Sequence, residues 1–86
     1  MIIRSQDKGV ITRDLDLWFD KCGKEYKIQN KEFNLGWYST VEKAIKVLDM
    51  IQNAYTNSCK VAISSDGQMQ HMVIPVVFQM PQDSEV

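Results

Sequence analysis

The stretch that decides the fold is Gly36-Trp37-Tyr38-Ser39-Thr40-Val41-Glu42-Lys43-Ala44-Ile45-Lys46-Val47-Leu48-Asp49-Met50-Ile51-Gln52. Ser39 and Glu42 have the spacing of a capping box, in which each side chain accepts a hydrogen bond from the other residue's backbone N–H. Apolar residues then recur at intervals of three and four, the period of one helix face: Val41, Ala44, Ile45, Leu48, Ile51 and Tyr55. The sequence therefore predicts an amphipathic helix that starts near Thr40.

Alternation of apolar and polar residues predicts strands on both sides of this helix. Residues 1–5 and 10–12 are expected to be extended around a turn at 6–9, and Gly23 suits the positive φ of a hairpin turn at 21–24. After the helix, we expect a small hairpin around 64–67 and a last strand over 73–78, where Pro75 belongs at an edge or a bulge. The residues expected to face the core before the helix are Leu15, Leu17, Phe19, Tyr26, Ile28, Phe33, Leu35 and Trp37.

This order predicts an α+β fold, an antiparallel sheet of about four to five strands with one amphipathic helix packed on one face, in the order β-β-β-β-α-β. A chain of 86 residues has room for one core. We expect a single α+β domain over 1–82 and an acidic frayed tail over 83–86.

Composition excludes several classes of protein. Ten Lys and Arg against eleven Asp and Glu give a net charge of −1, which argues against a duplex-DNA or membrane-surface binder. The first residues lack the pattern of a signal peptide, and no apolar run approaches the ~20 residues of a membrane span. We therefore expect a cytoplasmic protein, in which Cys22 and Cys59 are free thiols.

Residues with catalytic or metal-binding chemistry are sparse. His71 is the single histidine and has no recognisable catalytic partner in its neighbourhood. Asp14, Asp16 and Asp20 could hold a hard cation, but their alternation is typical of the solvated face of a strand. We expect no enzyme activity, no cofactor and no metal site.

One surface that could bind a partner is a lysine-rich hairpin. Lys21, Lys24, Tyr26, Lys27 and Lys31 form a basic segment with an aromatic residue, which predicts either a single-stranded nucleic-acid platform or a charged edge hairpin. The near-neutral net charge makes nucleic acid the weaker alternative.

The helix has more apolar residues than one sheet needs. Val47, Met50 and Ala54 are the surplus, and the C-terminal strand region or a second copy of the chain in a homodimer would cover them.

The aromatic residues near the helix differ in expected role. Trp37 shares the parity of Phe33 and Leu35, so we expect it in the core beneath the helix. Tyr38 has the opposite parity and is expected to be exposed. Trp18 lies on the polar side of its strand, where an exposed tryptophan is a candidate anchor for a partner.

Three motifs resemble a group of small proteins, with no assigned activity, that are encoded by phages and prophages of low-GC Gram-positive bacteria. They are Ile3-Arg4-Ser5-Gln6-Asp7-Lys8, the helix residues Glu42, Ala44, Val47-Leu48-Asp49 and Ile51-Gln52, and Phe78-Gln79-Met80-Pro81 before an acidic tail. The chain departs from the group at Ile2, where Trp is common. The resemblance implies a phage or prophage product acting in a bacterial cytoplasm.

The polar run at the N-terminus has two interpretations. It either pairs internally, with Arg4 bound to Asp7 or Asp49, or rings a recognition site. The candidate binding residues are Arg4, Gln6, Asp7, Lys8, Trp18 and Tyr38.

Our first hypothesis is a non-catalytic protein that binds a host or phage protein and forms a homodimer through Val47, Met50 and Ala54. The alternatives are a nucleic-acid accessory that uses the lysine hairpin, and a protein that sequesters a small anionic ligand with Arg4 and Lys8.

Overall fold

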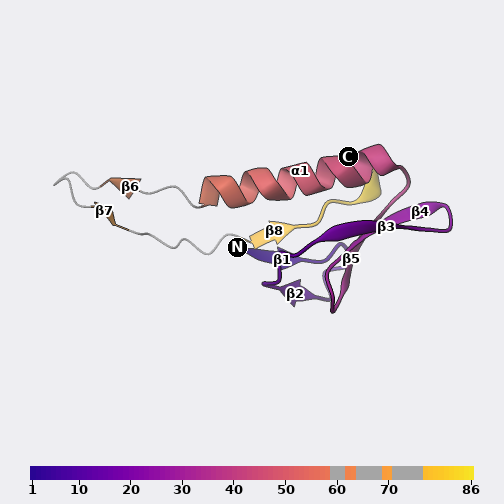
Figure 1. Ribbon diagram of the computed structural model, residues 1–86, viewed down its shortest axis with the longest axis horizontal. Helices are drawn as coiled ribbons and strands as arrows, with labels where there is room; N and C mark the ends of the chain where they lie inside the picture. The colour runs from indigo at the N-terminus through magenta and orange to yellow at the C-terminus, as the bar shows by residue number, and fades with distance from the viewer. Residues whose placement is uncertain (59–61, 64–68, 71–76) are drawn as a thin grey trace.

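The fold is α+β, as the sequence predicts, with one α-helix packed against two small sheets in the described part of the chain (Figure 1). The structure is a computed structural model that describes residues 1–58, 62–63, 69–70 and 77–86. In chain order the elements are β1 (Ile2–Arg4), β2 (Ile11–Thr12), β3 (Trp18–Cys22), β4 (Glu25–Gln29), β5 (Asn34–Tyr38), α1 (Val41–Ser58), β6 (Ala62–Ile63), β7 (Met69–Gln70), β8 (Val77–Gln79) and the 3-10 turn η1 (Asp83–Glu85).

The first sheet joins the two ends of the chain, in the strand order β2-β1-β8. β1 pairs antiparallel with β2 but parallel with β8, where Ile3 lies opposite Phe78 and Arg4 opposite Gln79. Parallel neighbours need a long crossover, which here contains α1. The strands therefore do not form the single antiparallel sheet that the sequence suggested.

The second sheet is the antiparallel meander β3-β4-β5. Gly23 and Lys24 form the loop between β3 and β4, and Gly23 has a φ of +62°, which confirms the predicted role of this glycine. Before β3, the alternating residues Leu15 and Leu17 pack against the core, and Phe19 continues this pattern within the strand.

A β-bulge in β5 reverses the predicted orientation of two aromatic residues. Ile28 pairs with Gly36 but the next residue, Gln29, pairs with Asn34, so Leu35 is an extra residue in the ladder. Tyr38 then shares a face with Gly36 and is fully buried, whereas the side chain of Trp37 is 38% exposed. The predictions of a buried Trp37 and an exposed Tyr38 were both wrong.

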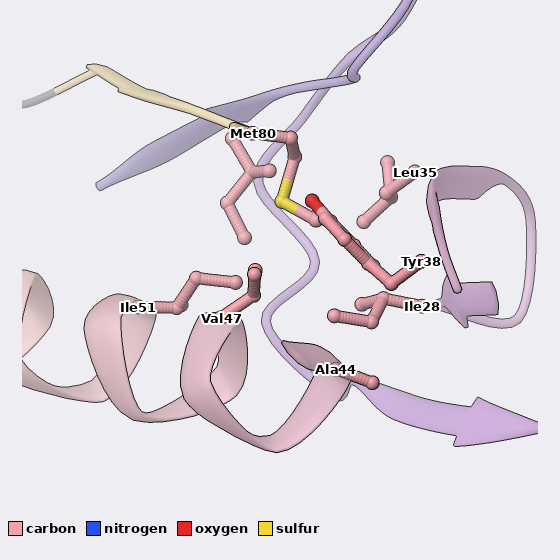
Figure 2. Close-up of a cluster of buried hydrophobic side chains, with 8 residues drawn as sticks. Ile28, Leu35, Tyr38, Ala44, Val47, Ile51 and Met80 are labelled. Atoms are coloured by element: carbon pink, nitrogen blue, oxygen red, sulfur yellow. The ribbon is translucent and has the colours of Figure 1, made fainter. Parts of the chain in front are cut away.

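The core lies between α1 and the two sheets, and Figure 2 shows its side chains converging on the ring of Tyr38. Gly36 is needed at this point, because a Cβ there would lie 2.9 Å from the Tyr38 hydroxyl oxygen and 3.1 Å from the Met80 methyl carbon. The buried apolar residues are Ile3, Ile28, Leu35, Tyr38, Ala44, Val47, Ile51 and Met80.

The helix begins one residue later than a Ser39 cap would place it. The hydroxyl oxygen of Thr40 accepts from the Lys43 N–H at 3.2 Å, and the Thr40 carbonyl accepts from the Ala44 N–H. Thr40 is thus the N-cap. The predicted capping box of Ser39 and Glu42 was wrong, because the hydroxyl of Ser39 binds the chain's C-terminal segment instead.

The helix residues predicted to exceed what one sheet covers, Val47, Met50 and Ala54, do not form one exposed apolar surface. Val47 is fully buried within one chain, so its assignment to a dimer interface was wrong, and Ala54 is half-buried. Met50 and Ile45 are 37% and 45% exposed, but they lie about 140° apart around the helix axis at 100° per residue. Polar residues fill the arc between them, Glu42, Lys46 and Asp49 among them.

The C-terminal residues are ordered, contrary to the prediction of a frayed tail. η1 contains Asp83–Glu85, and Val86 packs against the core. The predicted hairpin after the helix is represented by β6 and β7, which pair antiparallel. Predictions about Cys59, the turn at 64–67, His71 and Pro75 fall outside the described residues.

Candidate binding face

A dense hydrogen-bond network ties the first turn of the chain to its last residues. We call this network, formed by residues 4–8, 36–39 and 79–85, the chain-end clasp. Within the first turn, the Ser5 hydroxyl donates to the Asp7 carboxylate at 2.6 Å, and the Gly9 N–H donates to the same oxygen at 2.9 Å. These two donors hold the pKa of Asp7 below its ordinary value. Lys8 takes a positive φ of 66° in this turn.

Gln6 joins this turn to the edge of β5. Its side-chain oxygen accepts from the Trp37 N–H at 3.0 Å, and its side-chain nitrogen donates to the carbonyls of Trp37 and Pro81 at 3.1 and 3.2 Å. The backbone N–H of Gln6 also donates to the Leu35 carbonyl at 2.7 Å. The amide thus pairs with β5 as a neighbouring strand would, and it closes that edge of the sheet.

Gln79 and Met80 hold the clasp from the other end. The Gln79 side chain donates to the carbonyls of Ser5 and Met80, at 2.9 and 3.1 Å. The Met80 N–H donates to the Arg4 carbonyl at 3.0 Å. The first and last motifs of the phage-protein resemblance are therefore in direct contact.

The contacts of the polar run 4–8 are those of a structural turn. The Arg4 guanidinium donates to the Lys8 carbonyl at 3.3 Å, and not to Asp7 or Asp49 as the sequence suggested. Gln6 and Asp7 are committed to the clasp by the bonds already described. Internal pairing, one of the two interpretations of this run, accounts for the observed contacts, although its partners differ from those predicted.

Asp83 fastens the C-terminus to the start of α1. Its carboxylate accepts from the backbone N–H and the hydroxyl of Ser39 at 2.8 and 3.1 Å, and it lies 3.5 Å from the Lys43 ammonium. The Ser39 N–H, followed by the Ser39 hydroxyl and Lys43, holds the pKa of Asp83 below its ordinary value. Local sequence patterns could not indicate this contact, because Asp83 lies 44 residues from Ser39 and 40 residues from Lys43 in the chain.

Tyr38 belongs to the clasp and not to a binding surface. Its hydroxyl donates to the Pro81 carbonyl at 2.8 Å. Burial, and then the nearby charges of Asp83 and Glu85, raise the pKa of this phenol.

The outer face of the second sheet carries the two tryptophans. Because directly opposed residues of an antiparallel ladder share a face, the register places six side chains in two rows. One row is Trp18, Gln29 and Asn34, and the other is Asp20, Lys27 and Trp37. The two tryptophans therefore occupy opposite corners of this surface, which we call the tryptophan face.

Contacts among neighbours orient both indole rings. The Trp18 indole N–H donates to the Asp20 carboxylate at 3.2 Å, and the Gln29 side chain donates to the same oxygen. The Lys27 ammonium lies over the Trp37 ring, 5.8 Å from its centroid. Trp18 is nevertheless 41% exposed and Trp37 38% exposed. The rings are held in place but remain accessible.

The lysine platform predicted from the sequence is divided. By register, Lys21 lies opposite Tyr26 on the core-facing side of the sheet, whereas Lys27 lies on the tryptophan face. Tyr26 makes an edge contact with Phe19, with 6.3 Å between the ring centroids. Lys21, Lys24 and Tyr26 line one groove together, but Lys27 lies on the other face of the sheet, so the predicted basic segment is not a single surface.

Two grooves lie elsewhere on the described chain. One, of about 410 Å³, is apolar and is lined mainly by Met1, Leu15, Leu17, Leu48, Ile51 and Tyr55. The other is a shallower groove of about 510 Å³ between the β3–β4 turn and the start of α1, and Lys21, Lys24 and Glu42 contribute its charges.

Other chemistry is limited in the ranges that the structure describes. There, no group of three or more His, Cys, Asp or Glu side chains could hold a metal ion. Cys22 is an exposed free thiol, as predicted. The helix found among these residues is not long and apolar enough to cross a membrane.

Comparison of the chain with protein-family models, with curated proteins and with solved structures finds no match in any of the three.

Proposed function

We propose that this protein is a non-catalytic binding protein that contacts another protein through the tryptophan face. The observation that carries the proposal is the exposure of Trp18 and Trp37 on one sheet surface, on the side away from the core. Tryptophan is enriched among the residues that dominate protein-binding energy. Following the phage-protein resemblance, we propose a host or phage protein in a bacterial cytoplasm as the partner.

The geometry of the tryptophan face supports binding over a purely structural role. The contacts of Trp18 with Asp20, and of Trp37 with Lys27, restrict the rings before any partner arrives. A preorganised side chain loses less conformational entropy on binding than a mobile one. Asp20 and Lys27 also cancel in charge, so the face favours a neutral protein surface over a polyanion such as nucleic acid.

The test compares variants on this face with a matched variant on the helix. A tagged chain captures its partner from a Gram-positive host, and the dissociation constant is then measured with both proteins purified. We expect the double variant Trp18→Ala/Trp37→Ala to weaken binding at least 30-fold, which corresponds to loss of an interface hot spot of about 2 kcal/mol or more.

Ile45→Ala is the control, because Ile45 is also apolar and is 45% exposed, but on α1. It should leave the dissociation constant unchanged. Unchanged affinity of the double tryptophan variant, or loss of affinity in the Ile45 variant, would refute the proposal.

A further inference from the structure

The tryptophan face is small for a folded partner. It consists of six residues, whereas a standard protein–protein interface engages roughly 20–30 residues on each side. A second copy of the chain packed on this face alone would bury too little surface for a stable dimer. The size of the face instead suits a short linear segment.

A segment that lies across a sheet face has a particular hydrogen-bonding problem. The backbone groups of β4 are used in ladders on both sides, so they cannot pair with a ligand strand above them. A ligand lying there therefore gains from having few N–H groups of its own. Proline lacks the backbone N–H, and a polyproline II segment makes no internal hydrogen bonds.

The spacing of the two rings agrees with such a segment. Two strand spacings of about 4.8 Å and a two-residue step of about 6.8 Å place the Cα atoms of Trp18 and Trp37 about 12 Å apart. A polyproline II segment rises about 3.1 Å per residue and has three residues per turn, so prolines three residues apart lie on one face, about 9 Å apart, a separation that indole rings extending from these Cα atoms can match. One proline can thus lie on each indole ring.

The polar groups between the rings complement this ligand. The Trp37 indole N–H donates no hydrogen bond to another described residue, and the Lys27 ammonium lies over the same ring. Both are donors, and the carbonyls of a polyproline II segment are unpaired acceptors.

We infer that the tryptophan face binds a proline-rich segment of its partner in the polyproline II conformation, with one proline on Trp18 and another, three residues away, on Trp37. This inference rests on the proposed function, because it specifies what the partner presents to that face. Recognition of such segments by grooves lined with aromatic side chains is an established mode of peptide binding.

The test uses the intrinsic fluorescence of the full chain. The protein has two tryptophans, so Trp18→Phe and Trp37→Phe each leave a single reporter while keeping an aromatic ring at the substituted position. Each variant, shown by circular dichroism to be folded, is titrated with a proline decamer, a glycine-serine decamer, chitohexaose and a thymidine oligonucleotide.

We expect the proline decamer to shift the emission of both reporters over the same concentration range, and to bind at least tenfold more tightly than the glycine-serine decamer. Equal affinity for the two peptides, tighter binding of the glycan or the oligonucleotide, or no response from one reporter would overturn the inference. If a captured partner depends on both tryptophans but the proline decamer does not bind, the inference fails while the proposed function stands.

Discussion

The chain-end clasp and the tryptophan face meet in one residue, Trp37, and they use it in opposite ways. The backbone of Trp37 belongs to the clasp, where both its N–H and its carbonyl bond to Gln6. Its side chain belongs to the tryptophan face and remains accessible. Within the clasp, polar groups find partners inside the chain; on the face, aromatic surface is oriented but not covered.

This difference separates residues that hold the fold from residues available to bind. A polar run such as 4–8 suggests a recognition site when it is seen only as sequence, yet its hydrogen bonds are made internally. An exposed tryptophan contributes less to folding than a buried one, and the rings of Trp18 and Trp37 are accessible to a partner. Four predictions test whether the two regions are as distinct as their contacts indicate.

The largest effect is expected from replacing, one at a time, two adjacent residues whose side chains lie on opposite faces of β5. Tyr38→Ala should lower the free energy of unfolding by about 3–5 kcal/mol, because it empties the centre of the core. Trp37→Ala should lower it by about 1 kcal/mol or less, mainly through loss of the contact with Lys27. Urea denaturation measures both values, and equal losses would show that the tryptophan face also supports the core.

Tyr38→Phe keeps the ring and removes the hydroxyl, so it serves as the milder companion if Tyr38→Ala does not fold. It should cost about 1 kcal/mol, through loss of the hydrogen bond to the Pro81 carbonyl.

Gly36→Ala should be the next most damaging change. The added methyl group would overlap the Tyr38 ring and the end of Met80, and overpacking of this kind typically costs about 1–3 kcal/mol. Gly9→Ala is the matched control, because its nearest neighbour is the exposed side chain of Asp7 at 3.3 Å. Thermal melting of both variants provides the measurement, and a smaller loss at Gly36 than at Gly9 would contradict the packing argument.

Gln6→Ala tests the clasp without touching the core. Three side-chain hydrogen bonds disappear, but water can reach the groups that remain, so the expected loss is about 1–2 kcal/mol. Gln52→Ala removes the same side chain from an exposed site on α1 and should change stability by about 0.5 kcal/mol or less. If Gln6→Ala and Gln52→Ala have the same melting temperature, the side chain of Gln6 does not link the two ends of the chain.

The smallest expected effect is on the pH dependence of stability, through the carboxylate of Asp83. The folded-state pKa of Asp83 is lower than its ordinary value of 3.8. The ionised carboxylate therefore makes its full contribution to the free energy of unfolding above pH 3.8, and this contribution is lost as the pH falls through the lowered pKa. Asp83→Asn should therefore reduce the melting temperature at pH 7, and the difference from the unmodified chain should shrink as the pH falls below 3.8.

Asp49→Asn, on the exposed side of α1, is the control for this comparison. It should leave the melting temperature unchanged both at pH 7 and at acidic pH. A difference between Asp83→Asn and the unmodified chain that stays constant with pH would show that charge at Asp83 does not hold the C-terminus.

Much of the secondary structure could be predicted from local patterns, but the binding face could be predicted only in part. Trp18 was identified because alternation in its own segment places it opposite Leu17 and Phe19. Trp37 was missed, because the count from Phe33 carries no sign of the extra residue at Leu35. The acidic tail was misjudged for a related reason, since Ser39 and Lys43, which hold Asp83, lie far away in the chain.

By itself the sequence determined that a helix starts near Thr40, that alternation buries Leu15, Leu17 and Phe19, and that the chain turns at Gly23. These features depend on neighbours within a few residues, so local periodicity and backbone preference are sufficient. Only the tertiary structure decided that β8 pairs with β1, that Thr40 caps the helix, and that Tyr38 turns inward while Trp37 turns outward. The first two outcomes depend on partners distant in the chain, and the third depends on the extra residue at Leu35, which sets which of the two rings faces Gly36 and Met80.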